Sequence, residues 1–246
     1  MNILFVLTIG LIIGSFLNVC IYRIPRSESI SFPPSHCTNC DNKIKAYDLI
    51  PFISYILLRG RCRHCGEKIS IKYPIIELLT GGIFIALYIK FGLSIEFVKY
   101  SSLTCWLIVI GIIDFDTTDV YFKTTLSGIF AAVIFIIIGY FYGYSISEYV
   151  LGGLLGGGLI SVIVVLTKGM GLGDVEVFLL CGLFIGFKLT LVALFFSFII
   201  GGISGLLLII FKKKSRKDYI PFAPYIALGG ITAVLIGDFI IKWYTI

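Results

Sequence analysis

The apolar stretch at residues 189–211 reads LTLVALFFSFIIGGISGLLLIIF, and none of its side chains carries a charge. About 20 consecutive apolar residues are enough for a helix to cross the hydrocarbon core of a bilayer. The other apolar runs lie at 2–22, 74–90, 100–113, 125–144, 148–167, 175–187 and 223–242. They are continuous instead of alternating, which favours helices over the strands of a barrel. The sequence therefore predicts an all-α polytopic membrane protein with about eight transmembrane helices.

The composition agrees with this fold class. The chain is 58% hydrophobic and 14% charged, with a mean hydropathy of +1.03. These values exclude an ordinary soluble domain. The runs 100–113 and 175–187 are shorter than a full span, so we expect their ends to lie against protein or water.

The distribution of basic residues predicts the orientation of the chain. There are 20 lysines and arginines, and cytoplasmic loops of membrane proteins carry an excess of them. If residue 1 lies outside, only Lys90, Lys99, Lys188 and Lys242 fall on the outer side. Both termini are therefore expected outside. The basic run 212–217 is interpreted as a topology anchor next to membrane lipid, and we expect no nucleic-acid partner.

Residues 23–73 form the one long polar segment, which this orientation places in the cytoplasm. It contains two Cys-x-x-Cys pairs, Cys37-Thr38-Asn39-Cys40 and Cys62-Arg63-His64-Cys65. This spacing is typical of a four-cysteine zinc site, and four thiolates would close the coordination shell of a structural ion. Reduced cytosolic thiols argue against disulfides, and a redox-active dithiol is the alternative interpretation. The predicted metal ligands are Cys37, Cys40, Cys62 and Cys65.

Two aspartates stand at the ends of apolar runs, Asp114 after 100–113 and Asp174 before 175–187. A charged side chain at the centre of a membrane helix costs about 2.5–3.5 kcal/mol on insertion scales, so such residues are functional candidates. Both fall on the predicted cytoplasmic side, which suggests an acid/base pair. If the segment is helical, Asp116 points about 200° away from Asp114, and Asp116 and Asp119 are expected in solvent or at caps.

The alternative, purely structural interpretation of Asp174 is a helix N-cap after a glycine turn. The flanking Gly171 and Gly173 are expected to adopt backbone conformations closed to other residues, and to let a substrate strand approach.

An ordered series of motifs resembles the bacterial prepilin peptidases, also called type IV leader peptidases. The resemblance covers essentially the whole chain, and its strength lies in the order of the motifs around the zinc-type loop. The series comprises Gly14-Ser15-Phe16-Leu17-Asn18-Val19, Tyr22-Arg23-Ile24-Pro25, Pro33-Pro34-Ser35, Arg59-Gly60-Arg61-Cys62, Ile69-Ser70, Tyr73-Pro74-Ile75-Ile76-Glu77, Asp114-Phe115-Asp116, Gly171-Leu172-Gly173-Asp174 and Pro221-Phe222-Ala223-Pro224.

The resemblance implies a bifunctional enzyme of the bacterial cytoplasmic (inner) membrane with its active site on the cytoplasmic side. Asp114 and Asp174 would be the catalytic residues that remove the leader of prepilin or pseudopilin precursors. S-adenosylmethionine would then methylate the new N-terminus, with Asn18, Arg23 and Glu77 as candidate cofactor-binding residues. Residues 1–99 would form the methyltransferase-associated part, and residues 100–246 a six-span aspartyl peptidase domain.

The chain departs from the family pattern at two positions. The family usually has a proline where this chain has Tyr121, and a lysine where it has Glu176. Neither change removes a predicted catalytic carboxylate, although an added acid near Asp174 could alter how the pair titrates.

Two other functions remain open at this stage. A preflagellin-type or presenilin-like aspartyl protease without methyltransferase activity would share both aspartates, but the zinc-type loop favours the prepilin branch. An ion-coupled transporter would also use membrane carboxylates, although these aspartates lie at the ends of the runs instead of mid-membrane.

Overall fold

The computed structural model of the chain describes residues 3–167, 169–211 and 220–244. In this part of the chain the regular structure is helical, and the only strand-like pairings are two isolated bridges. Seven helices there are long and apolar enough to cross a membrane. They are α1 (Ile3–Arg23), α3 (Lys72–Phe91), α4 (Ile95–Thr117), α5 (Phe122–Phe141), α6 (Ile146–Thr167), α7 (Leu172–Ile210) and α8 (Ala223–Tyr244). The predicted all-α polytopic membrane fold is confirmed.

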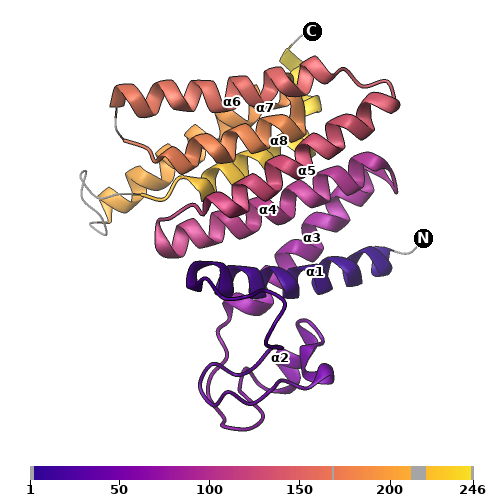
Figure 1. Cartoon of the computed structure of the whole chain (residues 1–246), viewed down its shortest axis with the longest axis vertical. Helices are drawn as coiled ribbons and strands as arrows, with labels where there is room; N and C mark the ends of the chain where they lie inside the picture. Colours follow the sequence, from indigo (N-terminus) through magenta and orange to yellow (C-terminus); the bar gives the residue numbers. More distant parts are fainter. Residues whose placement is uncertain (1–2, 168, 212–219, 245–246) are drawn as a thin grey trace. The chain divides into compact units, whose positions relative to one another are not determined.

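Helix α7 contains two of the predicted spans, 175–187 and 189–211. It has 39 residues, which would be about 58 Å if straight, nearly twice the thickness of the hydrocarbon core. It is not straight, because Gly186 has φ 80° and ψ 172°. A Cβ added to Gly156 of α6 would meet both the carbonyl oxygen of Phe178 at 2.7 Å and Thr190 at 3.4 Å. The chain therefore doubles back at Gly186, and both ends of α7 lie on the same side of the bundle (Figure 1). Counted by its two halves, α7 supplies the sixth and seventh of the eight predicted spans.

The chain packs as two compact units, residues 1–97 and 98–246. The functional division predicted at residue 99 remains a prediction, because packing alone does not assign an activity to either unit. The side of the membrane that each loop faces also remains a prediction. Lys168 and the basic run 212–217, which contributed to that prediction, lie outside the described residues.

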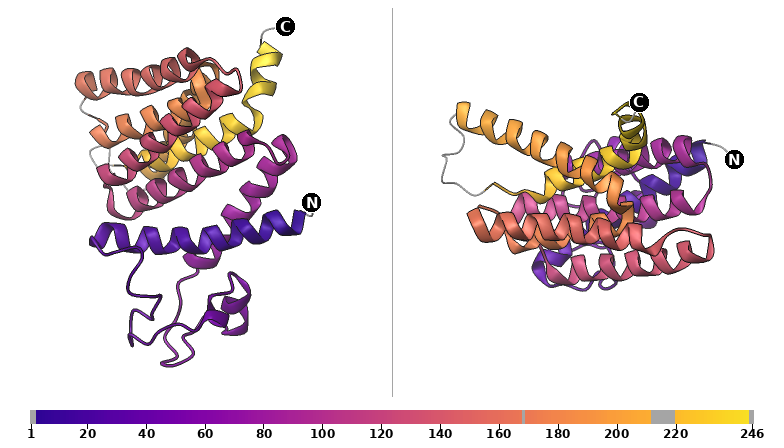
Figure 2. Two further views of the ribbon diagram at one scale, coloured as in Figure 1. Left: turned by 45° about the vertical axis from the view of Figure 1, so that its right-hand side comes forward. Right: turned by 90° about the horizontal axis from the view of Figure 1, so that it is seen from above.

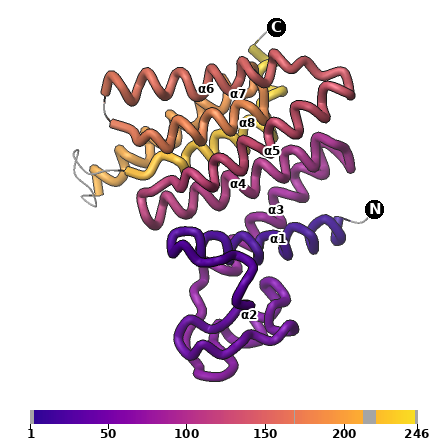
Figure 3. Tube along the Cα trace, in the orientation of Figure 1, coloured from indigo at the N-terminus to yellow at the C-terminus, as the bar shows by residue number. Residues whose placement is uncertain are grey.

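In the first unit, α1 packs against α3, and glycines allow the two backbones to approach closely. A Cβ on Gly10 would lie 2.7 Å from the Cα of Gly81, and one on Gly14 would lie 2.8 Å from the Cα of Glu77. The polar loop joins these two helices, as the tube in Figure 3 shows. It carries the short helices η1 (Ile24–Arg26), η2 (Ala46–Leu49) and α2 (Ile53–Leu57).

In the second unit, α7 is the central element and packs against α5, α6 and α8. Helix α8 follows the second half of α7 (Figure 2), where Gly229 contacts Ala193 and Ser197. The same helix contacts α4, because a Cβ on Gly111 would lie 3.3 Å from the Cα of Pro224. These contacts bring the end of α4 to the start of α8.

Candidate active sites

Asp114 is buried near the C-terminal end of α4, three residues before the helix ends at Thr117. Its side chain is 1% exposed. Oδ2 accepts a hydrogen bond from the backbone N–H of Ala223 at 3.0 Å. Oδ1 is buried and has no hydrogen-bond partner among the described residues. Buried polar atoms are rarely left without a partner, so this oxygen calls for an explanation such as a catalytic role.

Asp174 lies in the first turn of α7 and is equally buried, with 1% of its surface exposed. Its Oδ2 accepts a hydrogen bond from the backbone N–H of Gly171 at 3.0 Å, which closes the turn that begins the helix. The Asp114 carboxyl is close enough to act electrostatically on that of Asp174. In the second unit, two buried carboxyl groups, from the end of α4 and the start of α7, thus lie within electrostatic range of each other.

The glycines beside Asp174 adopt ordinary backbone conformations. Gly171 has an ordinary extended conformation, with φ −80° and ψ 154°, and Gly173 is helical. A Cβ on Gly173 would instead lie 2.5 Å from the Cβ of Val120, in the turn that follows α4. Gly173 is needed because Val120 approaches its backbone closely, and the expectation of unusual dihedral angles at this motif was wrong.

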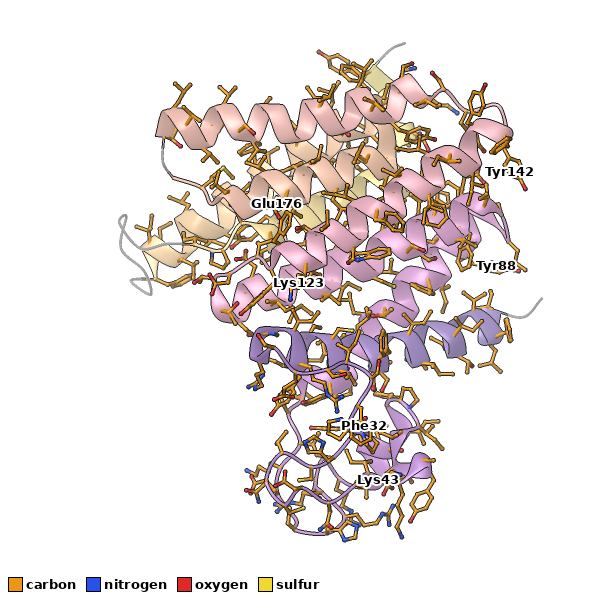
Figure 4. All side chains as sticks on the ribbon, viewed as in Figure 1. Phe32, Lys43, Tyr88, Lys123, Tyr142 and Glu176 are labelled. Carbon is orange, nitrogen blue, oxygen red and sulfur yellow. The ribbon has the colours of Figure 1, made fainter. Side chains whose placement is uncertain are left out.

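The remaining polar residues around the pair are less enclosed. Asp116 and Asp119 are both exposed, in contrast to Asp114. Glu176, labelled in Figure 4 on the first half of α7, accepts a hydrogen bond from the Thr125 hydroxyl of α5. The acid that replaces the family's lysine thus links α5 to α7. Tyr121 occupies the N-cap position of α5, in an extended conformation.

The four predicted metal ligands lie together in the loop of the first unit. The sulfur atoms of Cys37, Cys40, Cys62 and Cys65 all lie within 4.8 Å of one another. The Sγ atoms of Cys37 and Cys65 are 3.8 Å apart. A tetrahedral zinc ion with Zn–S bonds of about 2.3 Å places its sulfur ligands about 3.8 Å apart, whereas a disulfide requires about 2.05 Å. The donor set and its spacing therefore fit zinc.

The two cysteine pairs have the same local fold, repeated 25 positions along the chain. Cys37 N–H donates to the carbonyl of Asn42 as Cys62 N–H donates to that of Glu67. The bridge between His36 and Lys43 has its counterpart between Arg61 and Lys68. The backbone N–H groups of Cys65 and His64 also donate to the Cys62 thiol and lower its pKa, whereas the pKa of the Cys37 thiol, which shares a hydrogen bond with Cys62, is raised.

Three polar contacts support the cysteine cluster. Arg63, between the cysteines of the second pair, donates two hydrogen bonds to Asp48, at 2.8 Å and 2.6 Å. These bonds hold the pKa of the Asp48 carboxyl below its usual range. Asn39 and Asn42 direct their side-chain amides to the sulfur atoms of Cys65 and Cys40.

A cavity of about 390 Å³ lies in the first unit, within the range of small-molecule sites. The predicted cofactor residues Asn18, Arg23 and Glu77 all line it, together with aromatic side chains and parts of both cysteine pairs. Lys43, labelled in Figure 4, is another lining residue from the loop.

Each of the three predicted cofactor residues also makes a contact with the backbone. Asn18 donates to the carbonyl of Tyr73 at 3.1 Å, and Glu77 accepts from the N–H of Phe52 at 2.7 Å. Arg23 donates to the carbonyls of Ser29 and Pro33 at 2.8 Å and 2.6 Å. The Asn18 bond joins α1 to α3, and the bonds of Arg23 and Glu77 tie the polar loop to these helices, so together they shape the cavity.

Sequence reasoning missed two partners of the site residues. It assigned no role to Ala223, although the motif Pro221-Phe222-Ala223-Pro224 was noted, and it did not single out Phe52. Both act through a backbone N–H, which the residue type does not disclose. The only available signal was the position of a proline-flanked motif directly before the last apolar run.

Comparison with known proteins gives consistent matches over nearly the whole chain. The profile of the bacterial peptidase A24 N-terminal domain matches residues 8–91, and that of the type IV leader peptidase family matches residues 101–206. No solved structure matches the chain significantly.

Curated relatives match along almost their full length. A Bacillus subtilis protein named prepilin leader peptidase/N-methyltransferase is 34% identical over 99% of this chain and 97% of its own. A protein of the same name from Aeromonas hydrophila is 32% identical over 96% of this chain and 91% of its own. An Escherichia coli protein named type 4 prepilin-like proteins leader peptide-processing enzyme is 32% identical over 92% of this chain and 90% of its own. The predicted resemblance is thus confirmed, and the chain belongs to the type IV leader peptidase family.

Proposed function

We propose that this protein is a membrane aspartyl endopeptidase that removes the leader peptide of prepilins or pilin-like precursors, with Asp114 and Asp174 as its catalytic residues. The observation that carries the proposal is the pair of buried carboxyl groups from α4 and α7. Family membership supports it, since the names of the Bacillus and Aeromonas relatives state this activity. The transporter and the protease without methyltransferase activity are not favoured by these matches.

The chemistry needs one ionised and one protonated carboxyl group. Like charges at close range do not ionise together easily, so a carboxyl pair retains one shared proton. The carboxylate accepts a proton from water while the water oxygen attacks the scissile carbonyl carbon, and the carboxylic acid gives its proton to the carbonyl oxygen. The C–N bond then breaks as the amine nitrogen takes up a proton, which yields a new carboxyl group and a new amino terminus.

The depth of the pair suits such a substrate. Asp114 is near the end of α4, and Asp174 is near the start of α7. A precursor whose apolar helix remains in the bilayer would present the bond just before that helix at this depth. We propose that the site faces the cytoplasm, where the polar leader stays, as the positive-inside distribution predicts.

A second activity is proposed for the first unit. The relatives' names include N-methyltransferase, and we assign the methyl-donor site to the cavity lined by Asn18, Arg23 and Glu77. S-adenosylmethionine would supply an electrophilic methyl group there. The four cysteines would hold a structural zinc ion that stabilises the loop forming one side of this cavity.

The direct test is co-expression with a pilin-like precursor, with loss of the leader followed by gel shift. Asp114→Asn and Asp174→Asn each remove the charge at nearly constant volume, and each should abolish cleavage while the protein still accumulates in the membrane. Asp116→Asn is the matched control, because Asp116 is exposed on the same helix. This variant should cleave the precursor normally. Cleavage by either buried-site variant would remove that residue from the catalytic assignment.

A further inference from the structure

The first turn of α8 directs a backbone N–H at the Asp114 carboxylate. Ala223 is the first residue of α8 and is fully buried. Its N–H donates to Oδ2 of Asp114 at 3.0 Å, across 109 positions of sequence. The N–H groups of the first helical turn have no partner within their own helix, so they are available to an outside acceptor.

The sequence of α4 and α8 builds this contact. Gly111 lies one turn before Asp114, and a Cβ there would be 3.3 Å from the Cα of Pro224 and 3.4 Å from the Cβ of Ala227. The absence of a side chain at Gly111 thus allows α8 to approach the end of α4. Pro224, the second residue of α8, has no N–H, and the initial turn of a helix tolerates a proline there.

The contact also corrects an electrostatic disadvantage of Asp114. A carboxylate near the C-terminal end of its own helix faces the negative end of that helix dipole. Asp174 has no such problem, because it lies in the first turn of α7 and accepts an N–H from Gly171. The N-terminus of α8 gives Asp114 a backbone N–H donor and the positive end of a helix dipole, as the start of α7 does for Asp174.

We propose that the backbone N–H of Ala223 is a positioning group for the peptidase reaction, an inference that rests on the proposed function. By occupying Oδ2 it fixes the rotation of the carboxyl group and leaves Oδ1 as the oxygen that exchanges the proton with water. Oδ1 is the buried oxygen that has no partner among the described residues. The motif at 221–224 therefore belongs to the catalytic apparatus through its backbone.

The test is an amide-to-ester exchange, in which the α-hydroxy analogue of alanine replaces Ala223 in the full-length protein. The exchange keeps the methyl side chain and removes the N–H donor. It also weakens the Phe222 carbonyl, which accepts the N–H groups of Tyr225 and Ile226, and the ester at the control position carries the same kind of carbonyl change. A hydrogen bond to a charged group is strong enough that its loss should lower kcat for precursor cleavage by about 10- to 100-fold, with KM unchanged. The matched control is the same analogue at Ala233, also a fully buried alanine of α8, which should leave kcat within about twofold of wild type.

The outcomes are distinguishable from failure of the proposed function. If the wild-type protein does not cleave a pilin-like precursor, the proposed function itself fails. If the wild type cleaves and the esters at 223 and 233 behave alike, or if only KM rises at 223, the positioning role is overturned.

Gly111→Ala provides a second variant made of ordinary amino acids. Its methyl group would push the first turn of α8 away from α4, so kcat should fall while KM stays constant. Methylation of an already cleaved pilin should persist, because that reaction belongs to the other unit. Normal kcat in Gly111→Ala would count against the inference.

Discussion

Glu77 holds an otherwise unfavourable turn of the polar loop in place. The N–H that it accepts belongs to Phe52, which has φ 59° and ψ −48°. Positive φ is uncommon for bulky residues and persists only where the surroundings enforce it. The contact therefore fixes the chain between η2 and α2, where Phe52 lines the cavity of the first unit.

Substitutions of Glu77 should separate the two proposed activities. Glu77→Ala removes the acceptor, so methylation should be lost while leader cleavage continues. Glu77→Gln keeps a carbonyl oxygen that can accept the Phe52 N–H, and should retain both activities. Mass spectrometry of the mature N-terminus reports methylation, and gel shift reports cleavage. If Glu77→Gln loses methylation as completely as Glu77→Ala, the charge of Glu77 acts on the methyl donor directly.

At the scale of single residues, the sequence predicts side-chain chemistry better than it predicts backbone contacts. Asp114 and Asp174 could be identified because a charge beside an apolar run is costly, and the cysteines because metal ligands have typical spacings. The sequence does not reveal the contact made by the N–H of Ala223, since every residue except proline has a backbone N–H. The role of Gly173 was equally hidden, because its neighbour Val120 lies 53 positions earlier in the chain.

Among the elements of the second unit, the backbones of α6 and α7 approach each other very closely. A Cβ on Gly152 would lie 2.6 Å from both the carbonyl oxygen of Gly182 and the carbonyl carbon of Gly186. Backbone atoms cannot move aside as a flexible side chain can. Within the membrane, where water does not drive helices together, such close packing of small residues is a main source of helix association.

Two alanine substitutions on α6 should therefore differ in their effect on stability. Gly152→Ala should lower the free energy of unfolding by about 1–3 kcal/mol, as overpacked sites do. Gly158→Ala is the matched control, because nothing lies within 4 Å of a Cβ at that position. It should be neutral or stabilising by up to about 1 kcal/mol, since alanine favours the helix. Thermal unfolding in detergent measures both, and equal stability of the two variants would contradict the packing argument.

The reversal of α7 was only partly predictable. Lys188 interrupts the apolar sequence and separated the two predicted spans correctly. What the sequence could not reveal is that the chain turns back at a single residue, Gly186, without an intervening loop. The sequence contains many glycines and does not show which of them has a positive φ. The packing of α7 against α6 determines that this residue is Gly186.

For the molecule as a whole, the two units separate the proposed chemistries. The buried carboxyl pair lies entirely within residues 98–246, and the cavity and cysteine cluster lie within residues 1–97. Hydropathy predicted the long apolar helices because the bilayer fixes the length of each span. The extent of each unit depends on which helices pack together, and a hydropathy pattern carries no information about that.

Because α7 doubles back, the connection between Ile210 and Ala223 starts and finishes at the membrane surface that also holds Asp174. A thiol reagent that cannot cross membranes can therefore report which side of the membrane holds Asp174, through Phe211→Cys at the exposed C-terminal end of α7. This cysteine should react, above the background of the parent protein, only in permeabilised cells. Ser145→Cys, in the turn between α5 and α6, should react in intact cells. The reverse pattern would place proteolysis on the outer surface, away from the basic leader of an unprocessed precursor.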